Sequence, residues 1–128
     1  MIYKESNANP KRRKTNDCVI RAICNATGKQ WHEVYSGLSA LGYALCDMPN
    51  SKRVCEQYLD DIGWKKHRMP RKENGKRYTL SEFAETNGRI TAVVSVAKHL
   101  AALVDGELHD TWNCGHKCVG NFYTHPDF

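Results

Sequence analysis

Apolar side chains in the first half of the chain, residues 18–62, recur every three or four positions. This is the spacing of one face of an α-helix. Gly28 and Gly42 interrupt the pattern as helix-ending residues, and Asn16 and Asp17 are N-cap residue types immediately before its first stretch. The pattern therefore predicts three consecutive helices, each with one apolar face. The expected faces are Val19, Ala22, Ile23 and Ala26, then Trp31, Val34, Tyr35, Leu38 and Leu41, then Val54, Tyr58 and Ile62.

From residue 90 onward the pattern becomes that of β-strands. Residues 90–96 are apolar and rich in β-branched side chains, which favours a central strand. Residues 100–104 and 107–112 flank Asp105-Gly106, the dipeptide most typical of a two-residue type I′ turn, so we expect a hairpin. Helices first and strands last predict an α+β domain with an antiparallel sheet. Shorter elements are expected at 64–69 (strand), 79–88 (helix, from its capping-box spacing) and 119–124 (strand).

The composition is that of one ordinary globular domain. Of 128 residues, 41% are hydrophobic and 26% charged, which suits a single core. No apolar run approaches the roughly 18–20 residues that a membrane span needs. No apolar signal-peptide core follows the first residues, so we expect a cytoplasmic protein. Residues 1–15 are polar and basic and are expected to form a flexible arm, with residues 16–128 as the domain.

The formal net charge of +5 comes largely from two basic stretches, residues 11–14 and 65–77. Such stretches can bind nucleic acid or an acidic partner. Nucleic acid is not favoured, because no stacking aromatic side chains alternate with the basic ones and no nucleic-acid motif is present.

Two residues of the expected hairpin can form a catalytic pair. If Val104 pairs with Glu107 across the turn, His99 and Asp110 become diagonal neighbours on one face. Their Cβ atoms are then about 7–8 Å apart or less, within reach of an imidazole–carboxylate hydrogen bond. His109 points to the other face. The hairpin therefore selects His99 as the partner of Asp110.

Cys18, at the start of the first expected helix, is the candidate nucleophile. Free backbone N–H groups and the positive end of the helix dipole favour a thiolate there. His99 would act as general base and acid, and Asp110 would orient the imidazole.

An oxyanion formed during attack by this thiolate needs hydrogen-bond donors. The Cys18 backbone N–H is one candidate, and a side-chain amide upstream is the other, with Asn16 the nearest. Asn7 and Asn9 are alternatives, and an N-cap role for Asn16 is the competing interpretation.

The other cysteines suggest a metal site, which we do not favour. Cys114, His116 and Cys118 offer Zn²⁺ ligands at short spacing, but no Cys-x-x-Cys pair is present and no second pair completes a tetrahedral set. A plain loop is expected there, with no metal or cofactor. The six cysteines are expected to be mostly reduced.

The stretches around Cys18 (residues 16–22) and from His99 to Asp110 resemble those of papain-like cysteine peptidases, most of all small bacterial and phage-encoded members. The second stretch is similar to one in peptidases that cut the leader peptides of exported bacteriocins. The resemblance implies a papain-like fold, with a helical half carrying the nucleophile packed on an antiparallel sheet carrying base and acid. It also implies hydrolysis without metal or organic cofactor, in the host cytoplasm for a phage-encoded protein. Such enzymes often place an oxyanion-donating glutamine before the cysteine, where residues 11–14 here are basic.

Three functions stay open at this point. The first is hydrolysis of a peptide, isopeptide or other amide bond through a thioester, with a protein or peptide as substrate. The second is a non-catalytic binding or inhibitor protein on the same scaffold, such as a phage-type factor that sequesters a host protein or nucleic acid. The third is acyl transfer of the transglutaminase type by the same three residues, since sequence does not say whether water or an amine resolves the thioester.

Overall fold

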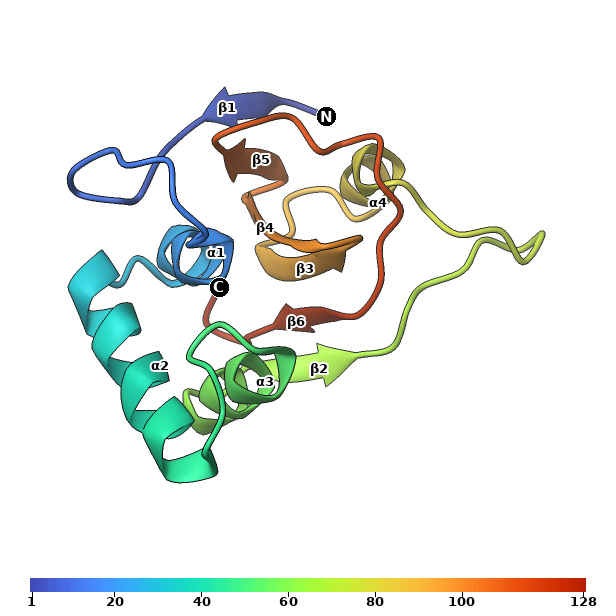
Figure 1. The fold of residues 1–128 in the computed structure, drawn as a ribbon. Helices are drawn as coiled ribbons and strands as arrows, with labels where there is room; N and C mark the ends of the chain where they lie inside the picture. Colours follow the sequence, from blue (N-terminus) through green and yellow to red (C-terminus); the bar gives the residue numbers. More distant parts are fainter.

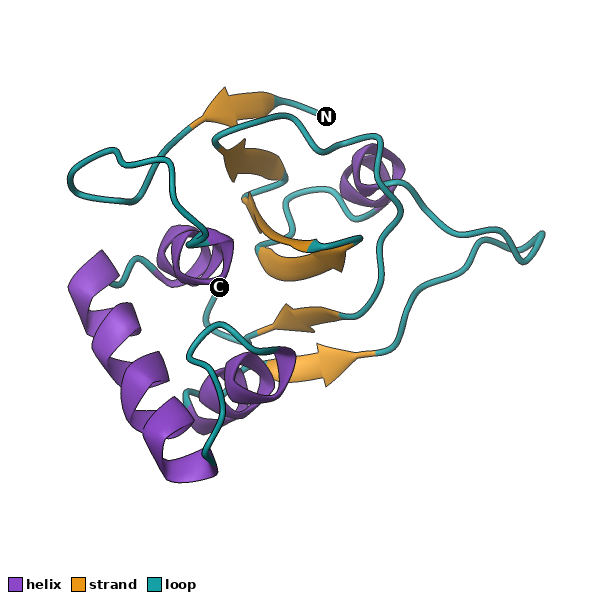
Figure 2. Ribbon diagram, in the orientation of Figure 1, coloured by secondary structure: helices purple, strands orange, loops and turns teal.

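In the computed structural model, which describes residues 1–128, four helices surround a six-stranded sheet (Figures 1 and 2). The helices are α1 (Cys18–Thr27), α2 (Trp31–Leu45), α3 (Lys52–Asp61) and α4 (Leu80–Thr86). The strands are β1 (Tyr3–Glu5), β2 (Lys65–His67), β3 (Ala92–Val96), β4 (His99–Val104), β5 (Glu107–Asp110) and β6 (Phe122–Thr124). The sheet order is β1-β5-β4-β3-β6-β2. The predicted α+β class is confirmed.

The sheet is mixed, and the prediction of an antiparallel sheet throughout was wrong at one edge. Tyr3 pairs with Leu108 and Glu5 with Asp110, which makes β1 parallel to β5, whereas all other neighbouring strands are antiparallel. The basic segment 1–15, expected as a flexible arm, thus contributes an edge strand to the sheet (Figure 1). A three-residue strand with two charged side chains carries too little hydrophobic alternation to be seen in the sequence.

The β4–β5 hairpin has the predicted register. Val104 pairs with Glu107, and the two turn residues Asp105 and Gly106 have φ values of 52° and 82°. Positive φ at both central positions is the requirement of a type I′ turn, which Asp-Gly meets at little cost. This local geometry fixes which side chains of β4 and β5 share a face.

The two faces of the sheet are covered by different helices (Figure 1). On one face, helices α1 to α3 pack on Val93 and Ala102. On the other, α4 packs on Val94 and Leu103. Because β3 and β4 are buried on both faces, their sequences are nearly continuous apolar runs.

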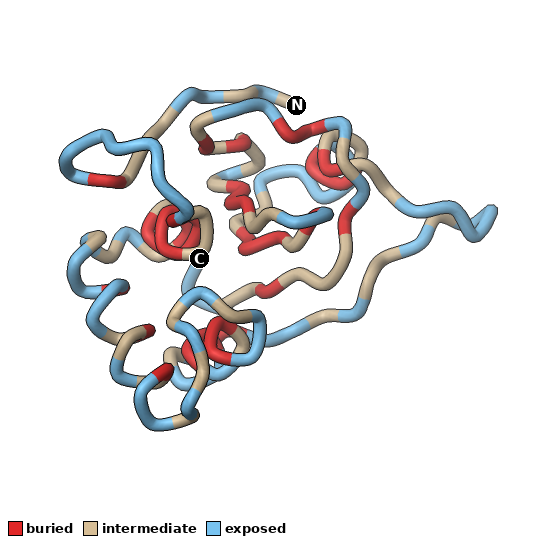
Figure 3. Tube along the Cα trace, viewed as in Figure 1, coloured by how far each residue is buried: buried red, intermediate tan, exposed pale blue.

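Buried residues concentrate in α1, α3, α4 and the central strands (Figure 3). The chain between β2 and α4 extends from the body as a mostly exposed loop (Figures 2 and 3). No helix combines the length and the apolar character that crossing a bilayer would require.

Candidate active site

His99 and Asp110 form a direct hydrogen bond, with 2.6 Å between His99 Nε2 and Asp110 Oδ2. The side chains are 8% and 3% exposed, so water screens the pair little. The diagonal contact expected from the hairpin register is therefore present. His109 instead places its Nε2 3.3 Å from Glu107 Oε1, away from this pair. The hairpin geometry thus distinguishes the two histidines as predicted.

Asp110 is held by three further donors. Arg21 Nη1 lies 2.9 Å from Oδ1, the Thr111 backbone N–H donates to the same oxygen over 2.7 Å, and the Cys114 thiol lies 3.8 Å from Oδ2. Burial acts to raise the pKa of Asp110, but the bonds and charges of His99, Thr111 and Arg21 outweigh it and lower that pKa. Asp110 is therefore an ionised, immobilised carboxylate.

Arg21 is a site residue that sequence reasoning missed. Its side chain is 10% exposed and bridges two buried carboxylates, with Nε 2.8 Å from Asp17 Oδ1 and Nη1 on Asp110. Asp17 also accepts from Trp31 Nε1 and Asn9 Nδ2, over 3.0 and 3.2 Å. The i,i+4 spacing of Asp17 and Arg21 was visible in the sequence, but the third partner lies 89 residues away.

The same network explains why Asp17, one of the two N-cap candidates, does not cap α1 with its side chain. Asp17 precedes α1, but its side chain makes no capping hydrogen bond because it is used by Arg21, Trp31 and Asn9. Asn16 is exposed and forms no cap either. Neither side chain therefore caps α1, the role that its residue type suggested.

Cys18 is the first residue of α1 and is partly buried. Burial acts to raise the pKa of its thiol, yet hydrogen bonds from the His99 side chain and the Leu100 backbone, with the charges of His99 and Arg21, lower that pKa overall. The opposite holds for Cys24 and Cys55, where burial raises the thiol pKa to about 11 and about 12. The surroundings of Cys18 therefore favour a thiolate, as a nucleophile requires.

The imidazole between thiol and carboxylate is favoured in its charged form. Burial acts to lower the pKa of His99, but hydrogen bonds to Asp110, Cys114 and Cys18 raise it well above its ordinary value. Nε2 is occupied by Asp110, which leaves Nδ1 as the ring nitrogen available to the Cys18 thiol. Trp112 covers the ring, with 5.0 Å between centroids. A thiolate–imidazolium pair is the arrangement that these contacts stabilise.

A cavity of about 380 Å³ opens at this pair and is lined by both Cys18 and His99. The nucleophile is thus accessible to a ligand. Val19, Val96, Leu100 and Tyr123 supply apolar wall, and Asn16, Asn50, Lys52 and Asn121 are among its polar lining residues. Walls of mixed character with a few polar groups near a perturbed titratable residue are typical of ligand sites.

Of the three asparagines considered for the oxyanion, only Asn16 lines this cavity. Asn9 is buried and donates to Asp17, and Asn7 lies near the Arg13 carbonyl, 3.5 Å from its Nδ2. The backbone N–H of Cys18 belongs to the first turn of α1, where amides have no intrahelical acceptor. The Asn16 side chain and that N–H are therefore two donors near the thiol that stay free for a ligand.

The structure does not bring Cys114, His116 and Cys118 together as metal ligands. Cys114 is fully buried and faces Asp110, whereas His116 and Cys118 are exposed. The potential ligand atoms that do cluster belong to His99, Asp110 and Cys114, all within 4.8 Å of one another. A cation there would have to displace the His99–Asp110 hydrogen bond, so the donor set fits a proton-transfer network better than a metal centre. All six cysteines are free thiols.

Comparison of the chain with models of protein families, with curated proteins and with solved structures found no match in any of the three. The chemistry of the site is therefore inferred from its own geometry.

Proposed function

We propose that this protein is a cysteine-nucleophile hydrolase of papain-like architecture that cleaves a peptide, isopeptide or other amide bond through a thioester. The observation that carries the proposal is that Cys18 and His99 line one open cavity, that the pKa of the thiol is lowered, and that His99 is hydrogen-bonded to Asp110 behind it. A protein that only bound a partner would have no need of an activated thiol beside a buried imidazole–carboxylate pair.

In the first half-reaction the Cys18 thiolate attacks the carbonyl carbon of the scissile amide, and the C=O π electrons move to oxygen. In this proposal the Cys18 backbone N–H and the Asn16 side chain, both at the cavity, donate to that oxyanion. The His99 imidazolium then gives its proton to the amide nitrogen, the C–N bond breaks, and an amine leaves. The products are a Cys18 thioester and neutral His99.

In the second half-reaction neutral His99 takes a proton from water as the water oxygen attacks the thioester carbon. The C–S bond breaks, the carboxylic acid product leaves, and the thiolate–imidazolium pair is restored. Asp110 stays ionised throughout, held by Arg21 and the Thr111 amide, and keeps the imidazole oriented. An amine in place of water would make the same site an acyl transferase.

Reactivity of the thiols tests the nucleophile directly. Iodoacetamide at neutral pH should alkylate Cys18 at least ten-fold faster than Cys46 and Cys118, which are exposed and so provide matched internal controls. Site-resolved mass spectrometry measures the three rates. Comparable rates at all three would overturn the proposal and favour the binding protein.

Turnover is tested with a peptide library from a digested proteome. Mass spectrometry should find new peptide termini that depend on Cys18 and are absent with Cys18→Ala but present with Cys46→Ala. Adding hydroxylamine separates hydrolysis from acyl transfer. Hydroxamate products in larger amounts than carboxylic acid products would identify acyl transfer. A library left unchanged by the wild-type protein would count against both.

A further inference from the structure

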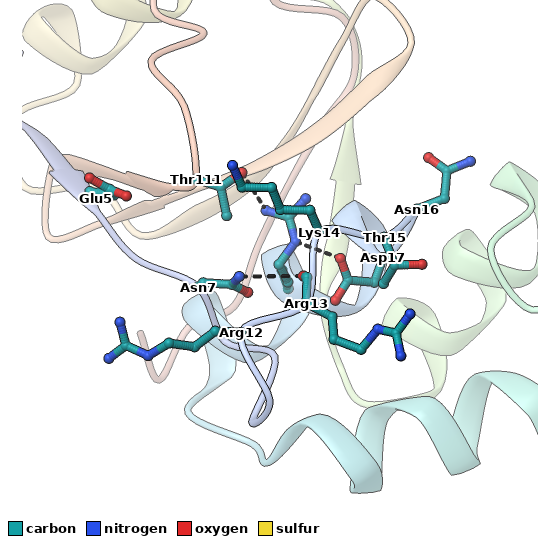
Figure 4. A pocket seen from close by; sticks show the side chains of 10 residues that line it. Glu5, Asn7, Arg12, Arg13, Lys14, Thr15, Asn16, Asp17 and Thr111 are labelled. Carbon is teal, nitrogen blue, oxygen red and sulfur yellow. Dashed lines mark hydrogen bonds and ion pairs between the residues drawn. The ribbon is translucent and has the colours of Figure 1, made fainter.

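A second and larger cavity, of about 720 Å³, lies beside the first, under the loop that leads into α1 (Figure 4). Its lining includes no hydrophobic side chain. Asn16 lines both cavities, so the two are neighbours at this residue. An extended ligand bound at Cys18 would have to pass Asn16 to reach the second cavity.

The walls of this cavity carry excess positive charge. Arg12, Arg13 and Lys14 follow one another along the loop, are exposed, and form no ion pair with any carboxylate of the protein. Of the two acidic lining residues, Asp17 is already paired with Arg21, which leaves Glu5 alone on the negative side. We call this the basic cavity.

A buried cation also lines the basic cavity. Arg21 uses Nε for Asp17 and Nη1 for Asp110 and Thr111, while its Nη2 has no protein partner. Every fully buried polar side-chain atom of the protein has a hydrogen-bond partner. Since Nη2 has none, it is not fully buried, and Arg21 lines this cavity. A guanidinium nine-tenths buried, with one free NH₂ group, is a donor prepared for an anionic ligand.

The loop that presents the three exposed cations is ordered by its own asparagines. Asn7 Oδ1 accepts from the Asn9 backbone over 3.0 Å, and Asn9 Oδ1 accepts from the Lys11 backbone over 2.9 Å. Asn9 Nδ2 reaches Asp17 over 3.2 Å and ties the loop to the start of α1. These bonds hold the backbone of the loop in place, which lowers the entropic cost of binding.

We propose that the basic cavity binds carboxylates of an acidic segment of the substrate, a few residues along the chain from the bond presented to Cys18. The inference rests on the proposed function and deepens it by naming the substrate class. An acidic peptide fits better than a nucleic acid, because no aromatic side chain lines the cavity to stack on a base. Carboxylates match the planar donors of arginine in geometry as well as charge.

Binding to the Cys18→Ala variant tests the cavity without catalysis. The probes are two fluorescein-labelled peptides, one with four consecutive glutamates and one with glutamines in their place, measured by anisotropy at about 0.15 M salt. The glutamate peptide should bind at least ten-fold tighter. Adding Arg12→Gln, Arg13→Gln and Lys14→Gln should abolish the difference.

A matched control removes the same charge elsewhere. Lys65→Gln, Arg68→Gln and Lys76→Gln change exposed cations of the other basic stretch and should leave the preference for glutamate intact. Equal loss in both triple variants, or a preference that survives the loop variant, would overturn the proposal. If a single-stranded oligonucleotide binds the loop tighter than the glutamate peptide does, the ligand of the basic cavity is a nucleic acid and not an acidic peptide.

The two proposals fail separately. If the glutamate peptide binds as expected while Cys18 of the wild-type protein alkylates no faster than Cys46, the basic cavity stands and the hydrolase does not. If Cys18 is reactive but the glutamate and glutamine peptides bind alike, the hydrolase stands and the acidic substrate does not.

Discussion

Arg21 on α1 and Asp110 on β5 form a buried ion pair, with 2.9 Å between Nη1 and Oδ1. It joins the helix that begins with Cys18 to the hairpin that carries His99. Because Asp110 also bonds His99, one carboxylate sets both the orientation of the imidazole and the position of the helix beside it. The geometry of the candidate site thus depends on Arg21, although Arg21 does not line the cavity at Cys18.

Replacing Arg21 by glutamine should destabilise the protein strongly. Two carboxylates, Asp17 and Asp110, would stay buried without their shared cation, and breaking a buried pair in this way costs about 3–5 kcal/mol. Urea unfolding measures the loss. Arg53→Gln is the control, because Arg53 is exposed on α3 and unpaired, and a change within about 0.5 kcal/mol is expected. Similar effects in both variants would contradict a structural role for the buried pair.

The His99–Asp110 pair should give stability a dependence on alkaline pH. The folded-state pKa of His99 is raised to about 11, above its ordinary value of 6.5. The stability from its proton is therefore complete below about 6.5 and is lost as pH rises toward 11. Urea unfolding of wild type and His99→Gln between about pH 5 and 10 should show the difference in stability shrinking as the pH rises. A difference that grows with pH would refute the assignment.

The reactivity of Cys18 should persist to lower pH than that of an ordinary thiol, because its pKa is lowered by His99, Leu100 and Arg21 against the effect of burial. Removing the imidazole with His99→Ala should shift the alkylation profile to higher pH, since burial then acts with less opposition. Iodoacetamide rates from pH 5 to 10 measure the midpoint. Cys46 in the same protein serves as the reference and should not move. An unchanged Cys18 midpoint in His99→Ala would mean that the two side chains do not interact.

The sequence was sufficient for the hairpin and insufficient for the network around it. Asp105-Gly106 is a local signal, and the register that it sets between the flanking strands placed His99 and Asp110 on one face. The contact of Arg21 with Asp110 joins residues 89 positions apart, and no local pattern encodes such a pairing. Strand β1 was missed for the same reason, since its parallel partner β5 lies at the other end of the chain.

Local rules also misassigned the residues before Cys18. Asn16 and Asp17 have the side chains of helix caps, yet the tertiary partners Arg21 and Trp31 recruit Asp17 instead. The flexibility expected of residues 1–15 rested on composition, which does not register that Asn9 is buried and bonded to Asp17. For Asp17 and Asn9, hydrogen bonds to partners outside the first helical turn took precedence over the local preference of the residue type.

Asp110→Asn should slow catalysis strongly and have much less effect on the accessibility of the Cys18 thiol. The amide keeps the shape of the side chain but removes the charge that holds the imidazolium, and it can select the wrong tautomer of His99. Turnover of a peptide found in the library experiment should fall by about 10²–10⁴-fold. Cys114→Ala is the comparison, because it removes only the weaker 3.8 Å contact to the same carboxylate, and its loss should be at least ten-fold smaller. Equal losses would place the two side chains in the same role.

Asn16→Ala separates two roles that residue type alone does not distinguish. If Asn16 capped α1, its loss would cost about 1 kcal/mol of stability and leave the chemical step intact. Because it makes no cap and lines the thiol cavity, we expect the reverse. The free energy of unfolding should change by less than about 0.5 kcal/mol, while kcat falls by about 10²–10³-fold through loss of an oxyanion donor. Alkylation of Cys18 by iodoacetamide forms no oxyanion and should proceed at the wild-type rate. A fall in kcat matched by slower alkylation would instead assign Asn16 to the positioning of the thiol.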